Sequence, residues 1–267
     1  MHIIAYFYQN YYNFSQIIFF VKCKFFVNGR KRALFRLIFW HLYNIMFRIT
    51  DICVGTGMGN IFDLFKQIST DNAGSVGKVE YIVVGLGNPG KEYEKNRHNA
   101  GFMAIDYISG RCGAPINRAK FSALVGEATL AGKRVLLLKP QTFMNLSGEA
   151  VSAAAKFYKI APENIIVISD DISLDVGRAR VRRKGSHGGQ NGLRNIEAQL
   201  GSQNYQRIKI GVGAKPHPDY DLASWVLSNF DASELNKLSE LYPKIYEGLC
   251  KMLEGDTEGA MQICNSK

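Results

Sequence analysis

Residues 81–101 read YIVVGLGNPGKEYEKNRHNAG, and this stretch decides the fold class of the chain. It begins with a short, mainly β-branched run, Tyr81 to Val84, followed by glycines, which predicts a buried strand that ends in a close backbone approach. Asn88 follows this strand, and His98 comes ten residues after Asn88. Because ligands of open α/β sheets bind outside the carboxyl ends of the strands, we expect both side chains near a substrate.

The glycines of this stretch also match a dinucleotide-binding pattern. Gly85, Gly87 and Gly90 form G-x-G-x-x-G directly after the strand. The fingerprint requires a helix to begin at once and receive a pyrophosphate at its N-terminus, whereas the polar segment KEYEKNRHN follows here. Asp106 has about the expected offset of the ribose-binding acid, but it falls in a helix-like run. A dinucleotide-dependent oxidoreductase is therefore an alternative that the sequence disfavours.

After residue 79 the hydrophobic pattern alternates between strands and helices. It predicts helices at 100–110, 150–158, 193–200 and 235–252, and strands at 81–84, 122–130, 134–138, 164–169, 177–183 and 207–213. A short segment, 131–133, connects two of these strands like a hairpin, which favours a mixed sheet over a purely parallel one. With no internal repeat or linker, we expect a single α/β domain over 79–267, with helices flanking the sheet.

Residues 1–57 differ in composition from the rest of the chain. Fifteen of the thirty-one aromatic residues precede Met58, and residues 1–60 carry seven basic side chains against one acidic one. Most of the net charge of +10 therefore belongs to this basic, aromatic extension. Charged residues interrupt its apolar runs, which disfavours a membrane-spanning helix, and a transit peptide fits the lack of acids but not the aromatic content. We expect instead that translation starts at Met46 or Met58.

The chemistry of the expected domain centres on His98. Asp170 ends another strand of the same sheet, and a carboxylate that accepts from the imidazole Nδ1–H would orient the ring and stabilise its protonated form. The chain has no G-x-S-x-G motif and no cysteine in a glycine-rich turn, so water is the expected nucleophile and histidine its general base. Five cysteines without C-x-x-C spacing disfavour a disulfide framework or a zinc site.

Neutral amides stand at several predicted strand ends. Asn88, Asn145 and Asn191 each follow a strand or open a helix, where an asparagine is commonly a turn residue. If the three converge on one mouth, they can hold carbonyl groups and water without adding charge, which suits an ester- or amide-bearing substrate.

A basic strand lies near this expected mouth. Its charges alternate on one face and continue on the last strand: Arg178, Arg180, Arg182, Arg207 and Lys209. Such a face can simply protect an edge strand from pairing with other chains. It can equally bind the phosphates of a substrate away from the reacting bond.

Four motifs, in order, match a known family. From about residue 79 to at least 253, the chain resembles the bacterial-type peptidyl-tRNA hydrolases. The resemblance is carried by GLGNPGKEY with RHNAG, then KPQTFMNLSG, ISDDISL and GSHGGQNGLRNI. The resemblance implies hydrolysis of the ester between a peptide and the 3′ ribose of tRNA, which frees the tRNA for reuse in translation. It also implies a twisted mixed sheet with a helical lid region, a cytoplasmic monomer, and neither metal nor cofactor.

The resemblance carries roles to matching positions. His98 matches the proton acceptor, Asp170 the aspartate that keeps it basic, and Asn88 the asparagine that distinguishes blocked from free aminoacyl ends. Further positions match contacts to substrate or tRNA: Tyr93, Phe143, Asn145, Asn191, Arg182 and Lys209.

The chain departs from the family pattern at three positions near Asp170. Ser169 and Asp171 stand where relatives often carry His and Glu, and Gln190 replaces a common His. We expect the polar network around Asp170 to differ and Gln190 to be a tolerated replacement. A non-catalytic RNA-binding relative stays the alternative, and loss of His98 or Asp170 would mark it, whereas both are present.

Overall fold

The β-branched run of residues 81–84 forms a central strand. In the computed structural model, which describes residues 77–266, this strand, β1 (Tyr81–Gly85), has a parallel neighbour on each side. Val83 and Val84 are fully buried, as expected of a central strand covered on both faces. The predictions for residues 1–57 lie outside the described residues.

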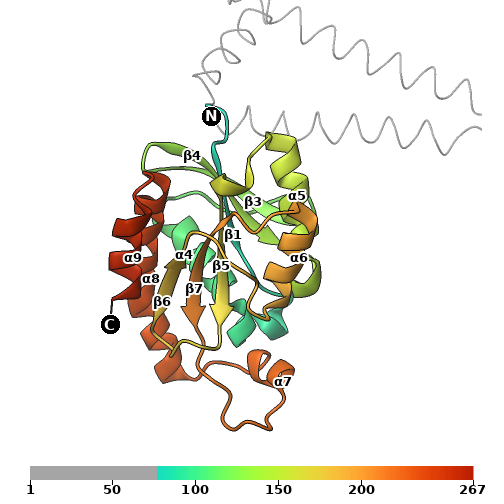
Figure 1. Cartoon of the computed structure of the whole chain (residues 1–267), viewed down its shortest axis with the longest axis vertical. Coiled ribbons are helices and arrows are strands. Elements are labelled where there is room, and N and C mark those ends of the chain that lie inside the picture. Colours follow the sequence, from blue (N-terminus) through green and yellow to red (C-terminus); the bar gives the residue numbers. More distant parts are fainter. Residues whose placement is uncertain (1–76, 267) are drawn as a thin grey trace, which may run out of the picture. The chain divides into compact units, whose positions relative to one another are not determined.

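Seven strands form one mixed sheet (Figure 1). Besides β1, they are β2 (Arg118–Lys120), β3 (Ala123–Leu130), β4 (Lys133–Pro140), β5 (Ile165–Asp171), β6 (Ala179–Arg182) and β7 (Gln206–Gly211). Their order across the sheet is β2-β3-β4-β1-β5-β7-β6. The pairs β4-β1, β1-β5 and β5-β7 are parallel, whereas β2-β3, β3-β4 and β7-β6 are antiparallel. The carboxyl ends of four strands therefore meet at one edge of the sheet.

The turn between β3 and β4 confirms the predicted hairpin. Ala131 and Gly132 connect the strands, and both have positive φ, 48° and 73°. A two-residue loop with both φ values positive twists in the same sense as the strands it joins, so it closes the hairpin without splaying them.

Six α-helices accompany the sheet within residues 77–266. They are α4 (Ala100–Arg111), α5 (Ser147–Tyr158), α6 (Asn191–Leu200), α7 (Leu222–Val226), α8 (Ala232–Leu253) and α9 (Thr257–Asn265). Four short 3₁₀ helices join them: η1 (Lys91–Tyr93), η2 (Arg97–Asn99), η3 (Met144–Leu146) and η4 (Pro162–Asn164). None of the helices in this part of the chain is long and apolar enough to cross a membrane.

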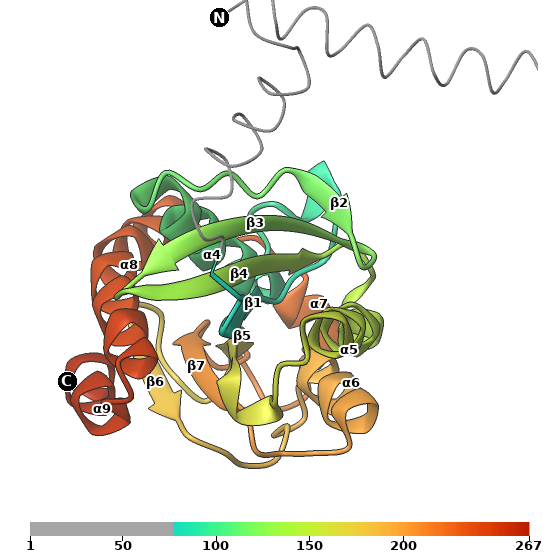
Figure 2. The ribbon, with the colours of Figure 1, turned by 90° about the horizontal axis from the view of Figure 1, so that it is seen from above.

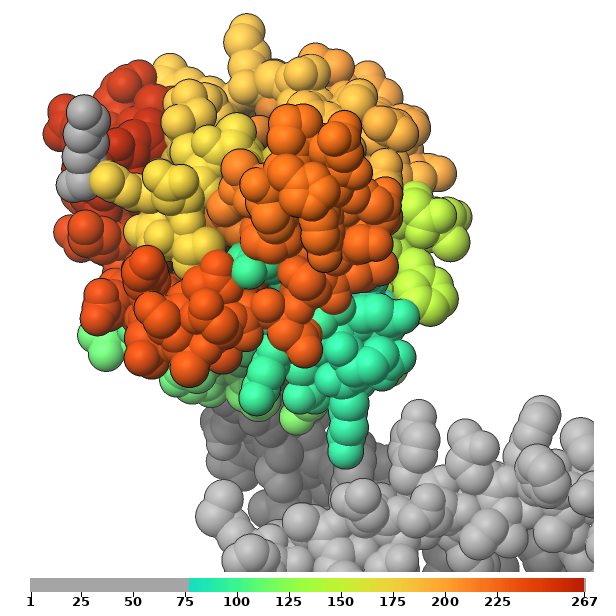
Figure 3. Space-filling model, turned by 90° about the horizontal axis from the view of Figure 1, so that it is seen from below, coloured from blue at the N-terminus to red at the C-terminus, as the bar shows by residue number. Residues whose placement is uncertain are grey.

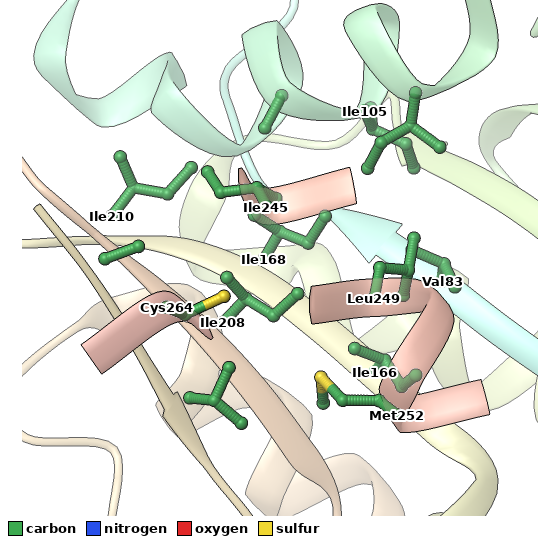
Figure 4. Close-up of a cluster of buried hydrophobic side chains, with 14 of the residues drawn as sticks. Val83, Ile105, Ile166, Ile168, Ile208, Ile210, Ile245, Leu249, Met252 and Cys264 are labelled. Carbon is green, nitrogen blue, oxygen red and sulfur yellow. The ribbon is translucent and has the colours of Figure 1, made fainter. Parts of the chain in front are cut away.

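The helices cover both faces of the sheet and create two apolar cores. Figure 2 shows α8 and α9 on one side and α5 and α6 on the other. The first core joins alternate strand residues such as Val83, Ile168 and Ile208 to α4 and α8 (Figure 4). The second joins the opposite strand faces to α5 and α6. The predicted α/β class, with a mixed sheet flanked by helices, is confirmed.

A glycine brings α4 into backbone contact with the sheet. A Cβ on Gly101 would lie 2.4 Å from the carbonyl oxygen of Ile168 and 2.6 Å from the amide nitrogen of Leu86. Only a residue without a side chain fits this approach. Because η2 directly precedes α4, the same contact places His98 at the carboxyl ends of β1 and β5.

The structure does not have the geometry of a dinucleotide fingerprint. After Gly90 the chain forms η1 and η2, and the first α-helix, α4, begins only at Ala100. Asp106 lies exposed on α4, where its carboxylate pairs with Lys139 at 2.7 Å. The oxidoreductase alternative therefore finds no support in the fold.

Candidate active site

His98 and Asp170 meet at the carboxyl end of the parallel strands. His98 lies in η2, Asp170 lies near the end of β5, and 2.8 Å separates the imidazole Nδ1 from the carboxylate Oδ2. Their side chains are 11% and 3% exposed, so the pair is nearly buried but the ring keeps some access to solvent. The predicted partnership between these two residues is thus present in the geometry.

Two opposing effects act on the pKa of His98. Burial alone would lower it, because a buried imidazolium loses hydration. The negative charge of Asp170 and its hydrogen bond to the ring outweigh burial, so the pKa of His98 lies above its ordinary value. The same hydrogen bond places the neutral ring's proton on Nδ1 and leaves Nε2 free to accept one.

Asn88 lies beyond the carboxyl end of β1, where hydrogen bonds of its backbone and of its side-chain oxygen hold it in place. Its backbone N–H donates to Asn99 Oδ1 at 2.8 Å, and its carbonyl accepts from Asn99 Nδ2 at 2.9 Å. Its own Oδ1 accepts from the backbone N–H of Met144 at 2.8 Å. The Asn88 amide therefore has its oxygen occupied, and its Nδ2 makes no hydrogen bond with the described residues.

Asn99 is a residue that the sequence analysis missed. It is 2% exposed and ties the loop after β1 to the segment that carries His98. Its position next to His98 in RHNAG was the signal available, but an asparagine before a helix is also an ordinary N-terminal residue.

Gln190 was expected to be a tolerated replacement, and the structure gives it a larger part. Its Nε2 donates to Asp170 Oδ1 at 3.0 Å and lies 3.1 Å from Met144 Sδ. Its Oε1 accepts from the backbone N–H of Leu193 at 2.6 Å, which caps the N-terminus of α6. Both oxygens of Asp170 are thus engaged, one by His98 and one by Gln190.

These contacts form a closed circuit around the site. The hydrogen bonds lead from Met144 to Asn88, from Asn88 to Asn99, which adjoins His98, and on through Asp170 to Gln190. Gln190 returns to Met144 through the sulfur contact. We call this set of six residues the site circuit: Asn88, His98, Asn99, Met144, Asp170 and Gln190.

Four further predicted residues lie on segments that adjoin the circuit. Asn145 follows Met144 in η3, and Asn191 follows Gln190 at the start of α6; both are exposed, and their side chains make no hydrogen bond with the described residues. Phe143 precedes Met144 and is 58% exposed, while Tyr93 is half-buried in η1. Phe143, Asn145 and Asn191 are therefore available to a ligand.

The two predicted phosphate contacts differ in their surroundings. Arg182 is exposed on the edge strand β6, whereas Lys209 on β7 pairs with Asp171 at 3.0 Å. Burial alone would raise the pKa of Asp171, but hydrogen bonds from Ser173 and the pairing with Lys209 lower it below its ordinary value. A phosphate at Lys209 therefore has to share the ammonium with a carboxylate.

Arg207 does not belong to the exposed basic face with which it was grouped. Its side chain is 1% exposed, pairs with Glu197 of α6 at 3.4 Å and lies 4.2 Å from the centre of the Tyr205 ring. That part of the prediction is wrong because α6 and the preceding loop cover this position of β7. Arg182, opposite Arg207 in the sheet, stays outside this cover.

Arg97, directly before His98, anchors this end of the molecule. Its buried guanidinium donates to both carboxylate oxygens of Glu234 at 2.9 Å and to the Val212 carbonyl at 3.0 Å. It also lies 3.9 Å from the centre of the Trp225 ring, a cation–π contact. These bonds hold η2 against α7 and the start of α8. Figure 3 views this end from below, where the orange segment around α7 covers much of the face.

Comparison with known proteins fits this arrangement. The family model described as peptidyl-tRNA hydrolase matches residues 82–267. The chain belongs to the peptidyl-tRNA hydrolase family. The peptidyl-tRNA hydrolase of Caldicellulosiruptor bescii is 47% identical over 187 residues, which cover 70% of this chain and 97% of that protein. That of Brevibacillus brevis is 50% identical over 159 residues, covering 60% of this chain and 84% of that protein.

A solved peptidyl-tRNA hydrolase shares the fold. The crystal structure from Acinetobacter baumannii matches with a TM-score of 0.67 and 33% identity, covering 72% of this chain and 98% of that one. The expected family and the expected fold class are thereby confirmed. Among residues 77–266 no group of three or more His, Cys, Asp or Glu side chains is arranged to hold a metal ion.

Proposed function

We propose that this member of the family cleaves the ester between a peptide, or an N-blocked amino acid, and the 3′ ribose of tRNA by direct attack of water, with His98 as general base. Membership of the family supports the reaction. The observation that carries the mechanism is the nearly buried His98–Asp170 pair at the carboxyl end of the parallel strands.

The proton movements follow from the hydrogen bonds of this pair. Asp170 holds the Nδ1–H of His98, so Nε2 accepts a proton from water as its oxygen adds to the ester carbonyl. The imidazolium, stabilised by the Asp170 carboxylate, then gives that proton to the departing 3′ oxygen. The products are the free carboxylic acid and tRNA with a free terminal hydroxyl.

Neutral donors accompany this base. The Nδ2 of Asn88 is without a partner among the described residues, and the amides of Asn145 and Asn191 are exposed nearby in the chain. We assign them to the peptide carbonyls and the developing oxyanion, because neutral donors stabilise such oxygens without changing the charge of His98.

Basic and aromatic groups are assigned to the tRNA. Arg182 and Lys209 bind phosphate, and Phe143 and Tyr93 contact the nucleotide at the mouth. The exposed ring of Phe143 and the exposed guanidinium of Arg182 support this assignment. The phosphates are thus bound away from the bond that breaks.

The central experiment measures release of N-acetylated amino acid from acylated tRNA by the wild type and by His98→Ala. Loss of the general base should lower kcat by about 10²- to 10⁴-fold and leave tRNA affinity nearly unchanged. His217→Ala is the matched control, since His217 is exposed and packs against Tyr220 instead of the circuit. Binding without release by the wild type would favour the non-catalytic RNA-binding alternative.

We further propose that residues from about 79 onward suffice for the reaction, and that the protein acts in the cytoplasm as a monomer without metal or cofactor. The family model, which begins at residue 82, supports the first point. A chain that starts at Met58, and a shorter one that starts at Val79, should each release the same product at the same rate. Light scattering during size-exclusion chromatography should give the mass of one chain. Addition of a chelator should leave the rate of ester hydrolysis unchanged.

A further inference from the structure

The amide of Gln190 has three partners on three different elements. It donates to Asp170 on β5, contacts Met144 in η3 and accepts from Leu193 in α6. A Cβ on Gly192 would lie 2.7 Å from Met144 Sδ and 3.1 Å from Gln190 Oε1. The first turn of α6 therefore lies so close to this amide and to Met144 that only glycine fits at position 192.

The orientation of the amide is also determined. Were it turned over, Oε1 would face the carboxylate oxygen of Asp170, and the N–H of Leu193 would face an NH₂ group instead of an acceptor. Both contacts would become repulsive. In the observed orientation every polar atom of the amide is matched, so Gln190 presents an N–H to Asp170 Oδ1.

We propose that Gln190 is a positioning residue for the reaction: it holds the second oxygen of Asp170 and so fixes the carboxylate against His98. The proposal rests on the proposed function of His98 as base. A carboxylate held at one oxygen can rotate about its side-chain bonds, whereas one held at both oxygens cannot. A residue that orients a reactive group through a hydrogen bond affects activity although it does not contact the substrate.

The surrounding charges leave this role to a neutral group. Asp171 is paired with Lys209, and Arg97 with Glu234, so neither pair offers a free donor to Asp170. The amide supplies a donor without adding a positive charge that would weaken the hold of Asp170 on the imidazolium.

Two variants separate this role from the capping of α6. Gln190→Met keeps the length of the side chain but loses both the donor and the cap. Gln190→Glu keeps an oxygen for the N–H of Leu193 but sets a second carboxyl group against Asp170. Gln190→Met lacks the donor, so it should lower kcat by roughly tenfold or more with little change in KM. In Gln190→Glu the two adjacent carboxyl groups share a proton, so the new side chain donates to Asp170 while it is protonated and repels Asp170 once it is ionised.

The pH dependence gives a readout that a structural role would not move. Without the donor, more of the negative charge of Asp170 acts on the imidazolium, and the pKa of His98 rises. The acid limb of kcat/KM should therefore move to higher pH in Gln190→Met. Titration of the His98 ring by NMR should show the same shift in Gln190→Met, with signals assigned by their absence in His98→Gln.

Asn195→Ala is the matched control. Asn195 also lies on α6 and accepts from the Gly148 N–H at 2.7 Å, but its side chain makes no hydrogen bond with the site circuit in the described part of the chain. It should lower thermal stability without moving the titration of His98. Unchanged kcat and an unchanged His98 titration in Gln190→Met would overturn the proposal, as would an equal loss in Asn195→Ala. If the wild type proved inactive, the proposed function would be wrong. If the Gln190 variants still shifted the titration of His98 in that case, the positioning of Asp170 by Gln190 would be supported on its own.

Discussion

At the scale of single residues, the charge of Asp170 sets the pH at which His98 can act. The base must be neutral, so activity rises as the pH passes upward through the raised pKa of His98. Asp170→Asn removes the charge that outweighs burial, so the pKa of His98 falls. The acid limb of kcat/KM should then move to lower pH while the maximal rate drops. A limb that stayed in place would mean that another group controls it.

The sequence could predict His98 and Asp170 because His98 comes after β1 and Asp170 lies near the end of β5, and the carboxyl ends of parallel strands meet. It could not predict the part of Gln190, which depends on how closely the first turn of α6 approaches β5 across 20 residues of chain. For Arg207 the sequence predicted an exposed basic side chain, and this prediction was wrong. Strand alternation separates two faces, but it does not say which face a helix will cover.

At the scale of elements, two glycines of α4 should respond in opposite ways to the same substitution. Gly101→Ala forces a methyl group to within 2.4 Å of a backbone oxygen, so α4 has to move and the free energy of unfolding should fall by several kcal/mol, about 3 or more. Gly110→Ala meets nothing within 4 Å and should add about 0.5–1 kcal/mol through helix propensity. Denaturant titration of both variants measures the difference, and similar values would contradict the close contact.

The bond between Arg97 and Glu234 makes a second element-scale prediction. Arg97→Met leaves the carboxylate of Glu234 without its main partner, and breaking a buried pair of this kind costs about 3–5 kcal/mol. Lys251→Met breaks an exposed pair with Glu254, and the change should stay within about 0.5–1 kcal/mol. Chemical denaturation compares the two. Equal losses would show that Arg97 is not an anchor.

The regular elements were largely predictable, and the irregular ones were not. Helical periodicity, strand alternation and short apolar runs located α4, α5, α6 and α8 and six of the seven strands, because each of them buries apolar side chains on one or both faces. The three-residue strand β2, whose residues are all exposed, was not predicted. The short helices η1 and η2 bury few apolar residues, and their shape depends on the bonds of Arg97 and Asn99. The C-terminal α9 follows Gly255 and was missed because its apolar stripe spans just nine residues.

At the scale of the whole molecule, charge is expected to govern how tRNA binding responds to salt. Arg182→Ala should weaken tRNA binding more at low salt than at high salt, and should reduce the slope of log Kd against log salt by about 1. Arg118→Ala provides the comparison. Arg118 is also exposed on an edge strand, but it lies on β2 at the opposite edge of the sheet and pairs with Glu127. Parallel salt lines for wild type and Arg182→Ala would place the phosphate elsewhere.

The closed form of the site circuit implies thermodynamic coupling between residues that do not touch. Asn88 and Gln190 share Met144 as a neighbour, and each is linked through other members to the His98–Asp170 pair. In a double-mutant cycle on kcat, Asn88→Ala and Gln190→Met should cost less together than the sum of their separate effects, by about 0.5–3 kcal/mol. Once one substitution has removed a contact of the site circuit, a second substitution removes constraints that the first has already relaxed. Additive losses would mean that the six residues act as separate pairs, each of which evolution could alter without regard to the others.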